Sequence, residues 1–321
     1  MRDPNFFIIG APKCGTTSLY EWLRTHPRIY MPDYKEPYFF CTDLQVRGIR
    51  SRRRYAALFA AADERHLAVG EGSAWYLYSE AAVPNIEACY REPKYIVCVR
   101  NPIEMAPSLH AQQILSAMET IEDFAEAWRM SGAWPPPTGS GRRTVYDEKL
   151  LNYKEVCSLG AQLERLLRTV PRERVHVVVF DDLRAAPRRE YLKVLRFLGV
   201  PDDGRRAFPA HNPRQKVASS FWLALLRAGN AAIAGLRLPP LHTGLLEWIA
   251  RRGFKPADRS PLAVELWEEL AAFYRDDIAR LERLLDRDLS KWLLHPSARR
   301  QDEGAAHAAP TAAEPPGKSA P

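Results

Sequence analysis

Two glycines separated by four residues follow the first hydrophobic run of the chain. Gly10 and Gly15 have the spacing of a phosphate-binding P-loop, but Thr16 stands where that loop carries its lysine, and Lys13 lies between the glycines. A strand that turns into a helix near Thr16 gathers backbone N–H groups and the positive end of a helix dipole around one point. The helix start adds three hydroxyl groups: Thr16, Thr17 and Ser18. The pattern predicts an anion site, and the alternative is an ordinary N-cap formed by a Ser/Thr cluster after a glycine turn.

A second group of polar residues follows another hydrophobic run. Arg100 comes directly after the run Tyr95–Val99, and Ser108 lies eight residues further on, in a helical stretch that begins near Pro102. A nucleoside triphosphatase places a carboxylate at such a strand end to hold Mg²⁺, whereas a cation attracts an anion and repels a metal. Arg100 and Ser108 are suited to grip a second phosphate group. Taken alone, Arg100 also fits an interface salt bridge.

The elements that position these residues alternate between strands and helices. Four near-continuous hydrophobic runs indicate strands buried on both faces of a parallel sheet: Phe6–Ile9, Leu67–Gly70, Tyr95–Val99 and Val175–Phe180. Helical periodicity lies between them, at Leu19, Trp22 and Leu23 and again from Leu159 to Leu167. The predicted fold is α/β, a P-loop-like doubly wound parallel sheet flanked by helices, in a single domain over residues 1–296.

Four segments interrupt or follow this alternation. The Pro/Gly-rich stretch Gly132–Arg143 is either a substrate lid or an insertion. Phe221–Ile249 suggests short helices that either pack on the domain or rest on a membrane as a peripheral contact. Leu262–Leu285 has the pattern of an amphipathic scaffold helix, and the Ala/Pro-rich residues 297–321 are expected to form a disordered tail.

Composition narrows the classes of partner and compartment. The net charge of +7 is uneven, because residues 205–259 hold ten Lys/Arg and two acidic residues, a balance that suits an anionic partner or a solvated surface. No recognisable nucleic-acid-binding module accompanies these charges. The polar start and the absence of an apolar run of about 20 residues argue against a signal peptide and a membrane span. The odd number of cysteines without a CxxC pair favours reduced thiols, a cytoplasmic location and no metal site.

Taken together, the motifs resemble those of the sulfotransferases that use 3′-phosphoadenosine-5′-phosphosulfate (PAPS), and most closely the bacterial and heparan-type carbohydrate branch. The resemblance covers roughly Asn5 to His295, with further matches in the stretches 26–40, 70–78, 177–201 and 276–293. In that family a loop like "APKCGTTSL" holds the 5′-phosphosulfate and a strand-end "RNP…S" holds the 3′-phosphate. The cosubstrate-binding residues implied here are Lys13, Cys14, Gly15, Thr16, Thr17, Ser18, Arg100 and Ser108, with Arg214 and Lys216 as further candidates in a closing loop.

The resemblance also implies a general base. The glutamate of a "KE-x-x-FF" element deprotonates the acceptor hydroxyl in this branch, and it corresponds to Glu36; without the resemblance, a surface turn with Lys35 and Glu36 exposed is the favoured interpretation. His110 is the rival base. One departure stands out: the heparan-type enzymes carry a lysine in an "E-K-T-P" element, where this chain has Gly72 after Glu71. The function of that lysine is either absent or supplied by another residue such as Lys35.

The expected reaction is in-line transfer of a sulfuryl group from PAPS to a hydroxyl group, with Lys13 stabilising the leaving phosphate and Glu36 taking the proton, without a metal. The expected acceptor is a glycan, a glycolipid or a small natural product; the oligomeric state stays open. Two alternatives remain: a P-loop kinase with an altered lysine, and a non-catalytic binder of nucleotide or polyanion.

Overall fold

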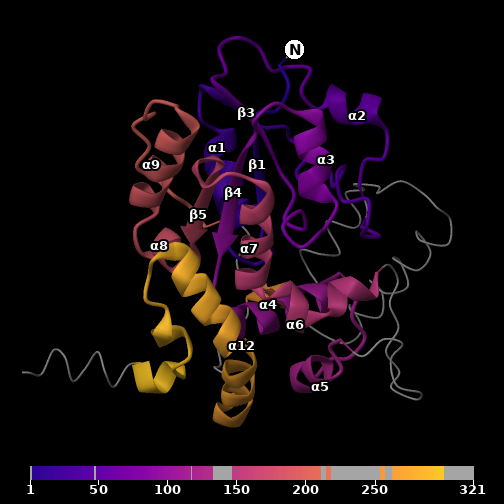
Figure 1. Ribbon diagram of the computed structural model, residues 1–321, viewed down its shortest axis with the longest axis vertical. Coiled ribbons are helices and arrows are strands. Elements are labelled where there is room, and N and C mark those ends of the chain that lie inside the picture. The colour runs from indigo at the N-terminus through magenta and orange to yellow at the C-terminus, as the bar shows by residue number, and fades with distance from the viewer. Residues whose placement is uncertain are drawn as a thin grey trace, which may run out of the picture.

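A five-stranded parallel sheet forms the centre of the protein (Figure 1). The computed structural model describes residues 2–46, 48–116, 118–132, 147–210 and 262–299, together with the backbone of two short strands at 215–217 and 254–256. The strands are β1 (Phe6–Gly10), β2 (Ile29–Tyr30), β3 (Ala68–Gly72), β4 (Lys94–Val99) and β5 (Val175–Val179), and they lie side by side in the order β2-β3-β1-β4-β5. Every neighbouring pair is parallel, so the prediction of a parallel α/β sheet is confirmed.

The strand order places β1 at the middle of the sheet. The chain adds β2 and β3 on one side of β1 and then crosses to add β4 and β5 on the other side. The direction of winding therefore changes next to β1, and ligands of open α/β sheets bind at the carboxyl ends of the strands at such a point. The loop that follows β1, which carries Lys13, begins at this position.

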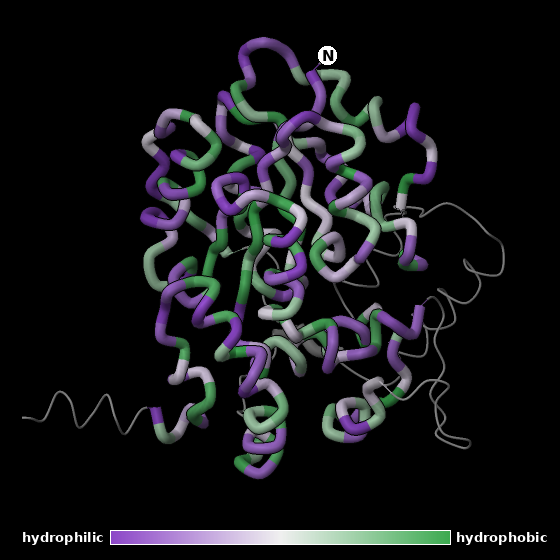
Figure 2. The backbone as a smooth tube through the Cα atoms, viewed as in Figure 1, coloured by the Kyte–Doolittle hydropathy of each residue, from purple (hydrophilic) through white to green (hydrophobic). Residues whose placement is uncertain are grey.

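The four strand predictions are confirmed with small shifts at the ends, and the reason is burial. All five residues of β1 and of β3 are buried, as are all residues of β4 after Lys94. Such strands need apolar residues on both faces and therefore appear as continuous hydrophobic runs. Figure 2 shows the same result, with hydrophobic chain concentrated in the strands that run through the centre. The short edge strand β2 was not predicted.

Helices cover both faces of the sheet. Those that the structure describes are α1 (Thr16–Arg24), α2 (Arg52–Ala57), α3 (Ala82–Cys89), α4 (Pro102–Leu115), α5 (Phe124–Arg129), α6 (Tyr153–Val156), α7 (Leu159–Thr169), α8 (Phe180–Ala185), α9 (Pro187–Leu198) and α12 (Val264–Leu285), with 3-10 turns at η1 (Glu148–Leu151), η2 (Arg172–Arg174) and η3 (Ser290–Trp292). Alternate residues of a strand face opposite sides. On β3, Gly72 accordingly lies against Tyr20 of α1, whereas the neighbouring Glu71 contacts Tyr76 on the other face.

The interrupting segments have different outcomes. The amphipathic helix predicted over Leu262–Leu285 is confirmed as α12, which starts at Val264. Residues 133–146 and the stretch from 221 to 249 lie outside the described residues, as does the tail from residue 300 onward. Residues 297–299, which the sequence assigned to the tail, belong to a helical turn in which Arg299 N–H donates to His295 O over 3.2 Å. Between these segments, β6 (Gln215–Val217) and β7 (Phe254–Pro256) pair antiparallel.

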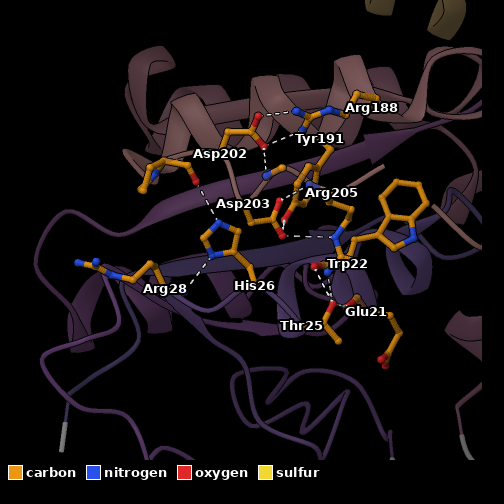
Figure 3. Close-up of polar contacts among 12 residues, drawn as sticks. Glu21, Trp22, Thr25, His26, Arg28, Arg188, Tyr191, Asp202, Asp203 and Arg205 are labelled. Atoms are coloured by element: carbon orange, nitrogen blue, oxygen red, sulfur yellow. Dashed lines mark hydrogen bonds and ion pairs between the residues drawn. The ribbon is translucent and has the colours of Figure 1, made fainter. Parts of the chain in front are cut away.

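A polar network ties the end of α1 to the segment after α9 (Figure 3). His26 accepts from the backbone N–H of Arg28 at Nδ1, over 3.0 Å, so its Nε2 carries the hydrogen and donates to Pro201 O over 3.0 Å. Asp203 accepts from the Tyr191 hydroxyl over 3.2 Å, and Arg205 donates to the Thr25 hydroxyl over 2.6 Å. These bonds fix α1 at its carboxyl end, and the loop that contains Lys13 precedes the other end of α1.

Candidate functional site

The loop between β1 and α1 lies at the carboxyl ends of the strands and leads into the start of helix α1. Gly15 is the N-cap residue of α1, and no side chain of the described residues caps this helix, so the proposed Ser/Thr N-cap is wrong. Gly15 has φ 89°, and a Cβ there would lie 2.9 Å from the Leu183 side chain, so both conformation and space require glycine. Lys13 is also left-handed, with φ 63°. A helix start that follows such a turn directs its backbone N–H groups and the positive end of its dipole toward one point, which favours an anion there.

Arg100 joins this loop from the end of β4. Its Nη1 donates to Lys13 O over 3.2 Å, its Nη2 lies 3.1 Å from a carboxylate oxygen of Glu104, and its guanidinium lies 4.7 Å from the centre of the Phe180 ring. The residue is 6% exposed, and its Nε is buried without a hydrogen-bond partner among the described residues. Buried polar atoms are normally paired, so this donor points to a missing acceptor.

One stripe of α4 faces the same loop. Glu104, Ser108 and Gln112 follow one another at intervals of four residues, which places them on one side of the helix. Glu104 contacts Arg100, and Gln112 accepts from Lys13 Nζ over 3.2 Å. Ser108 is buried between these two contacts. The structure thus brings Lys13, Arg100 and Ser108 together, and it adds Gln112, which the spacing from Ser108 would have indicated.

The other predicted loop residues divide between the first helical turn and the core. Thr16 is buried, and Thr17 and Ser18 are partly buried in the first turn of α1. The Cys14 side chain points inward, where its Sγ lies 3.4 Å from Pro12 O and 3.6 Å from the Met105 sulfur. Burial raises the pKa of the Cys14 thiol to about 12 despite the nearby Arg100 and Lys13. The thiol is therefore neutral, and it does not line the loop.

Glu36 lies at the same edge of the sheet, on the segment after β2. Its backbone N–H donates to Gly72 O over 3.0 Å, at the carboxyl end of β3, and the strand β3 pairs directly with β1. The carboxylate, partly exposed, contacts Lys35 Nζ and accepts from the Tyr38 hydroxyl. Lys35 is partly buried as well. These contacts hold the Glu36 side chain in place, so the pair is not a freely exposed surface turn.

The space around Gly72 does not accommodate the lysine of the "E-K-T-P" element. A Cβ at Gly72 would lie 2.7 Å from the ring of Tyr20, so a side chain does not fit there. Lys35 Nζ lies 5.9 Å from the centre of the same Tyr20 ring while it contacts Glu36. The ammonium of Lys35 thus reaches the surroundings of the Tyr20 ring from the segment after β2.

His110 is turned away from the stripe that faces the loop. Residues two apart on a helix point in different directions, and His110 is two residues after Ser108. Its ring is buried against Phe124 and Tyr153, at 5.6 and 5.7 Å between ring centres, and its Nε2 lies 2.8 Å from Ile121 O. This position is that of a core histidine with a main-chain partner.

Of the remaining candidates, Arg214 lies outside the described residues, and Lys216 is described only by its backbone in β6. Within the described ranges, no three His, Cys, Asp or Glu side chains cluster in a way that would hold a metal ion. None of the described helices is long and apolar enough to cross a membrane.

An open groove of about 740 Å³ lies elsewhere, along α9. Its apolar lining includes Leu192, Leu195 and Phe208, and its basic residues include Arg196 and Arg206. Among the described residues, none of those predicted for cosubstrate binding or catalysis lines this groove. We therefore place the candidate site at the loop after β1, where the buried cation Arg100, the start of α1 and Glu36 all lie at the carboxyl ends of the strands.

Comparisons with known proteins identify the family of the chain. Residues 3–223 match the model of the sulfotransferase domain family. The chain is 30% identical over 165 residues to carbohydrate sulfotransferase 15 of Mus musculus, covering 38% of this chain and 29% of that protein. It is 25% identical over 311 residues to the bifunctional heparan sulfate N-deacetylase/N-sulfotransferase 4 of Mus musculus, covering 90% of this chain and 31% of the relative. The chain thus spans less than a third of the length of these two relatives.

A solved structure gives a match over nearly the whole chain. A sulfotransferase from Alicyclobacillus acidocaldarius superposes with a TM-score of 0.66 at 28% identity, covering 91% of this chain and 99% of that structure. With the family model covering more than two thirds of the sequence, the chain belongs to the sulfotransferase domain family.

Proposed function

We propose that the protein transfers a sulfuryl group from PAPS to a hydroxyl group of a carbohydrate, glycolipid or natural-product acceptor. The observation that carries this proposal is Arg100, a buried guanidinium at the switch point of the sheet whose Nε has no partner among the described residues. Such a donor needs an acceptor, and the positive charge of the guanidinium favours an anionic one. The residues of the site fit PAPS, because they offer separate places for two phosphate groups.

Two groups of residues would hold the two phosphate groups. Arg100 and Ser108 would hold the 3′-phosphate, while the start of α1, with Gly15, Thr16, Thr17 and Ser18, would hold the 5′-phosphosulfate. Arg100 donates to Lys13 O, and Lys13 Nζ donates to Gln112, so both the backbone and the ammonium of Lys13 are held by residues of the segment that follows β4. Arg214 and Lys216 remain candidates for a basic loop that closes over the nucleotide.

Bound PAPS supplies a sulfuryl group that is already linked to a phosphate leaving group. Glu36 accepts the proton of the acceptor hydroxyl as the oxygen–sulfur bond forms and the bond from sulfur to the phosphate oxygen breaks. Lys13 and the N–H groups of α1 stabilise the charge that develops on that phosphate. Lys35 contacts Glu36 and supplies a positive charge beside the reacting group, in place of the lysine that Gly72 excludes.

We assign the base to Glu36 rather than to His110 because their surroundings differ. Glu36 is partly exposed at the sheet edge, whereas His110 is buried among aromatic rings with Ile121 O as its partner. For the acceptor class, two relatives are a carbohydrate sulfotransferase and a heparan sulfate N-sulfotransferase by name. A cytoplasmic location fits the five cysteines, all of which are free.

An acceptor screen tests the proposal. Purified protein is incubated with radiolabelled PAPS and panels of glycans, glycolipids and small hydroxylated metabolites, and labelled products are separated. The active acceptor is then assayed with the variants Lys13→Ala and Glu36→Gln and with Glu173→Gln as an exposed-carboxylate control. Normal turnover by both site variants would refute the assigned roles, and absence of binding to adenosine 3′,5′-bisphosphate would refute PAPS as donor.

A further inference from the structure

The Glu104 carboxylate lies between two arginines at the candidate site. One oxygen lies 3.1 Å from Arg100 Nη2, and the other lies 3.6 Å from Arg299 Nη1. The three side chains are mostly shielded from solvent, with 8% of Arg100, 29% of Glu104 and 24% of Arg299 exposed. The pairing of an acid with two cations in such surroundings is stronger than on an open surface, because screening is weaker.

This carboxylate occupies the stripe on which a phosphate is proposed to bind. Glu104 is one helical turn before Ser108 and directly contacts Arg100, the two residues assigned to the 3′-phosphate. A carboxylate beside a phosphate dianion is repelled by it, and both compete for the same guanidinium. Glu104 therefore opposes phosphate binding unless its charge is neutralised elsewhere.

Arg299 is positioned to neutralise the charge of the Glu104 carboxylate. Its Nε donates to Leu294 O over 2.9 Å, its Nη2 donates to Trp292 O over 3.1 Å, and its guanidinium lies 5.3 Å from the Trp267 ring centre. Trp292 O also accepts from Asn101, the N-cap residue of α4, over 2.9 Å. Arg299 is thus fixed against the start of α4 by bonds that do not involve Glu104, and Nη1 is directed at the carboxylate.

We propose that Glu104 is a resident anion that holds Arg100 in the empty site and moves onto Arg299 when the nucleotide phosphate takes its place. This inference rests on the proposed PAPS function, which supplies the phosphate. Glu104 lowers nucleotide affinity by competing for Arg100, and Arg299 limits that cost by holding the displaced carboxylate. Arg299 is a positioning residue that acts through Glu104 and does not touch the phosphate.

Calorimetric titration with adenosine 3′,5′-bisphosphate tests this exchange in a double-mutant cycle. Glu104→Gln is expected to bind about three- to tenfold more tightly than the wild type, because the competitor has lost its charge. Arg299→Gln is expected to bind about three- to tenfold more weakly. In the Glu104→Gln background, Arg299→Gln should change affinity by less than about twofold. Glu126→Gln, which removes an exposed carboxylate from the first turn of α5, should match the wild type.

Each other outcome has a distinct meaning. Unchanged or weaker binding by Glu104→Gln, with normal binding by the wild type, overturns the inference and leaves the proposed function intact. An equal loss from Arg299→Gln in both backgrounds also overturns it, since Arg299 would then contact the phosphate directly. No binding by the wild type overturns the proposed function and the inference with it. Where circular dichroism shows that Glu104→Gln is unfolded, Glu104→Asp replaces it, with a shorter reach and an expected gain of about twofold; unchanged or weaker binding then counts against the inference.

Discussion

Arg100 Nη1 donates to the main-chain oxygen of Lys13 over 3.2 Å, a contact that joins the end of β4 to the loop after β1. Both residues are cations of the candidate site, and the bond fixes the Arg100 side chain against the Lys13 backbone. The Arg100 guanidinium cannot move without releasing the Lys13 backbone, which is held with φ 63°. The conformation of the loop after β1 and the position of the Arg100 guanidinium therefore depend on each other.

Arg100→Lys is expected to weaken binding of adenosine 3′,5′-bisphosphate by about ten- to a hundredfold. A lysine keeps the positive charge but lacks the planar guanidinium. That group donates to Lys13 O and is proposed to bind a phosphate at the same time. The measurement is isothermal titration calorimetry. Arg129→Lys, at an exposed arginine that pairs with Glu269, serves as the control and should bind like the wild type. Equal affinities for Arg100→Lys and the control would remove Arg100 from the phosphate site.

Lys13→Ala is expected to lower kcat by about 10²- to 10³-fold, since one preorganised cation at the leaving phosphate is lost. Gln112→Ala should have a smaller effect, about two- to fivefold, because Lys13 Nζ loses one partner but keeps its charge. Steady-state assays at saturating PAPS separate the two variants. A Gln112 variant as impaired as the Lys13 variant would mean that Gln112 itself contacts the substrate.

Glu36→Gln is expected to lower kcat by about 10²- to 10⁴-fold while nucleotide affinity stays within about twofold of the wild type. The amide retains the shape of the side chain and its contact with Tyr38 but cannot take a proton. His110→Gln provides the comparison at the rival position, with activity expected to follow the amount of folded protein. The reverse ranking, with His110→Gln inactive although folded and Glu36→Gln active, would transfer the role of the base to His110.

Glu71 gives the protein a pH-dependent stability. The side chain is fully buried on β3, and burial raises the pKa of its carboxyl to about 7, although Ser73, Tyr55 and Tyr76 favour the charged form. The carboxyl is protonated in the folded protein and ionised in the unfolded chain between about pH 4.5 and pH 7. The free energy of unfolding of the wild type therefore falls as pH rises through this window.

Urea unfolding of the wild type and Glu71→Gln at several pH values measures this effect. The amide does not titrate, so the variant should gain stability relative to the wild type as pH rises from 5 to 8, by a few kcal/mol at most. Glu173→Gln, at an exposed carboxylate, controls for the loss of one charge. A difference between wild type and Glu71→Gln that is constant with pH would show that Glu71 titrates normally in the folded state.

The sequence by itself determined the features that depend on neighbouring residues along the chain. The run Phe6–Ile9 followed by Gly10 and Gly15 predicts a strand, a tight turn and a helix start, because burial periodicity and glycine spacing are local properties. The same applies to Arg100 at the end of β4 and to Ser108 on the helix that follows it. These local patterns were sufficient to predict the parallel sheet and the class of site.

Tertiary structure decided which side chains meet, because those contacts join residues far apart in sequence. Gln112 reaches Lys13 across 99 residues, Glu36 is anchored to Gly72 of β3, and Arg299 approaches Glu104 from the segment after η3. The periodicity of the sequence does not encode such pairs. They follow from the order of the strands and from the packing of α4 and η3 at the carboxyl ends of the strands. The packing also turned His110 into the core beside Tyr153, and it brought Lys35 Nζ to 5.9 Å from the centre of the Tyr20 ring, the ring that leaves no room for a side chain at Gly72.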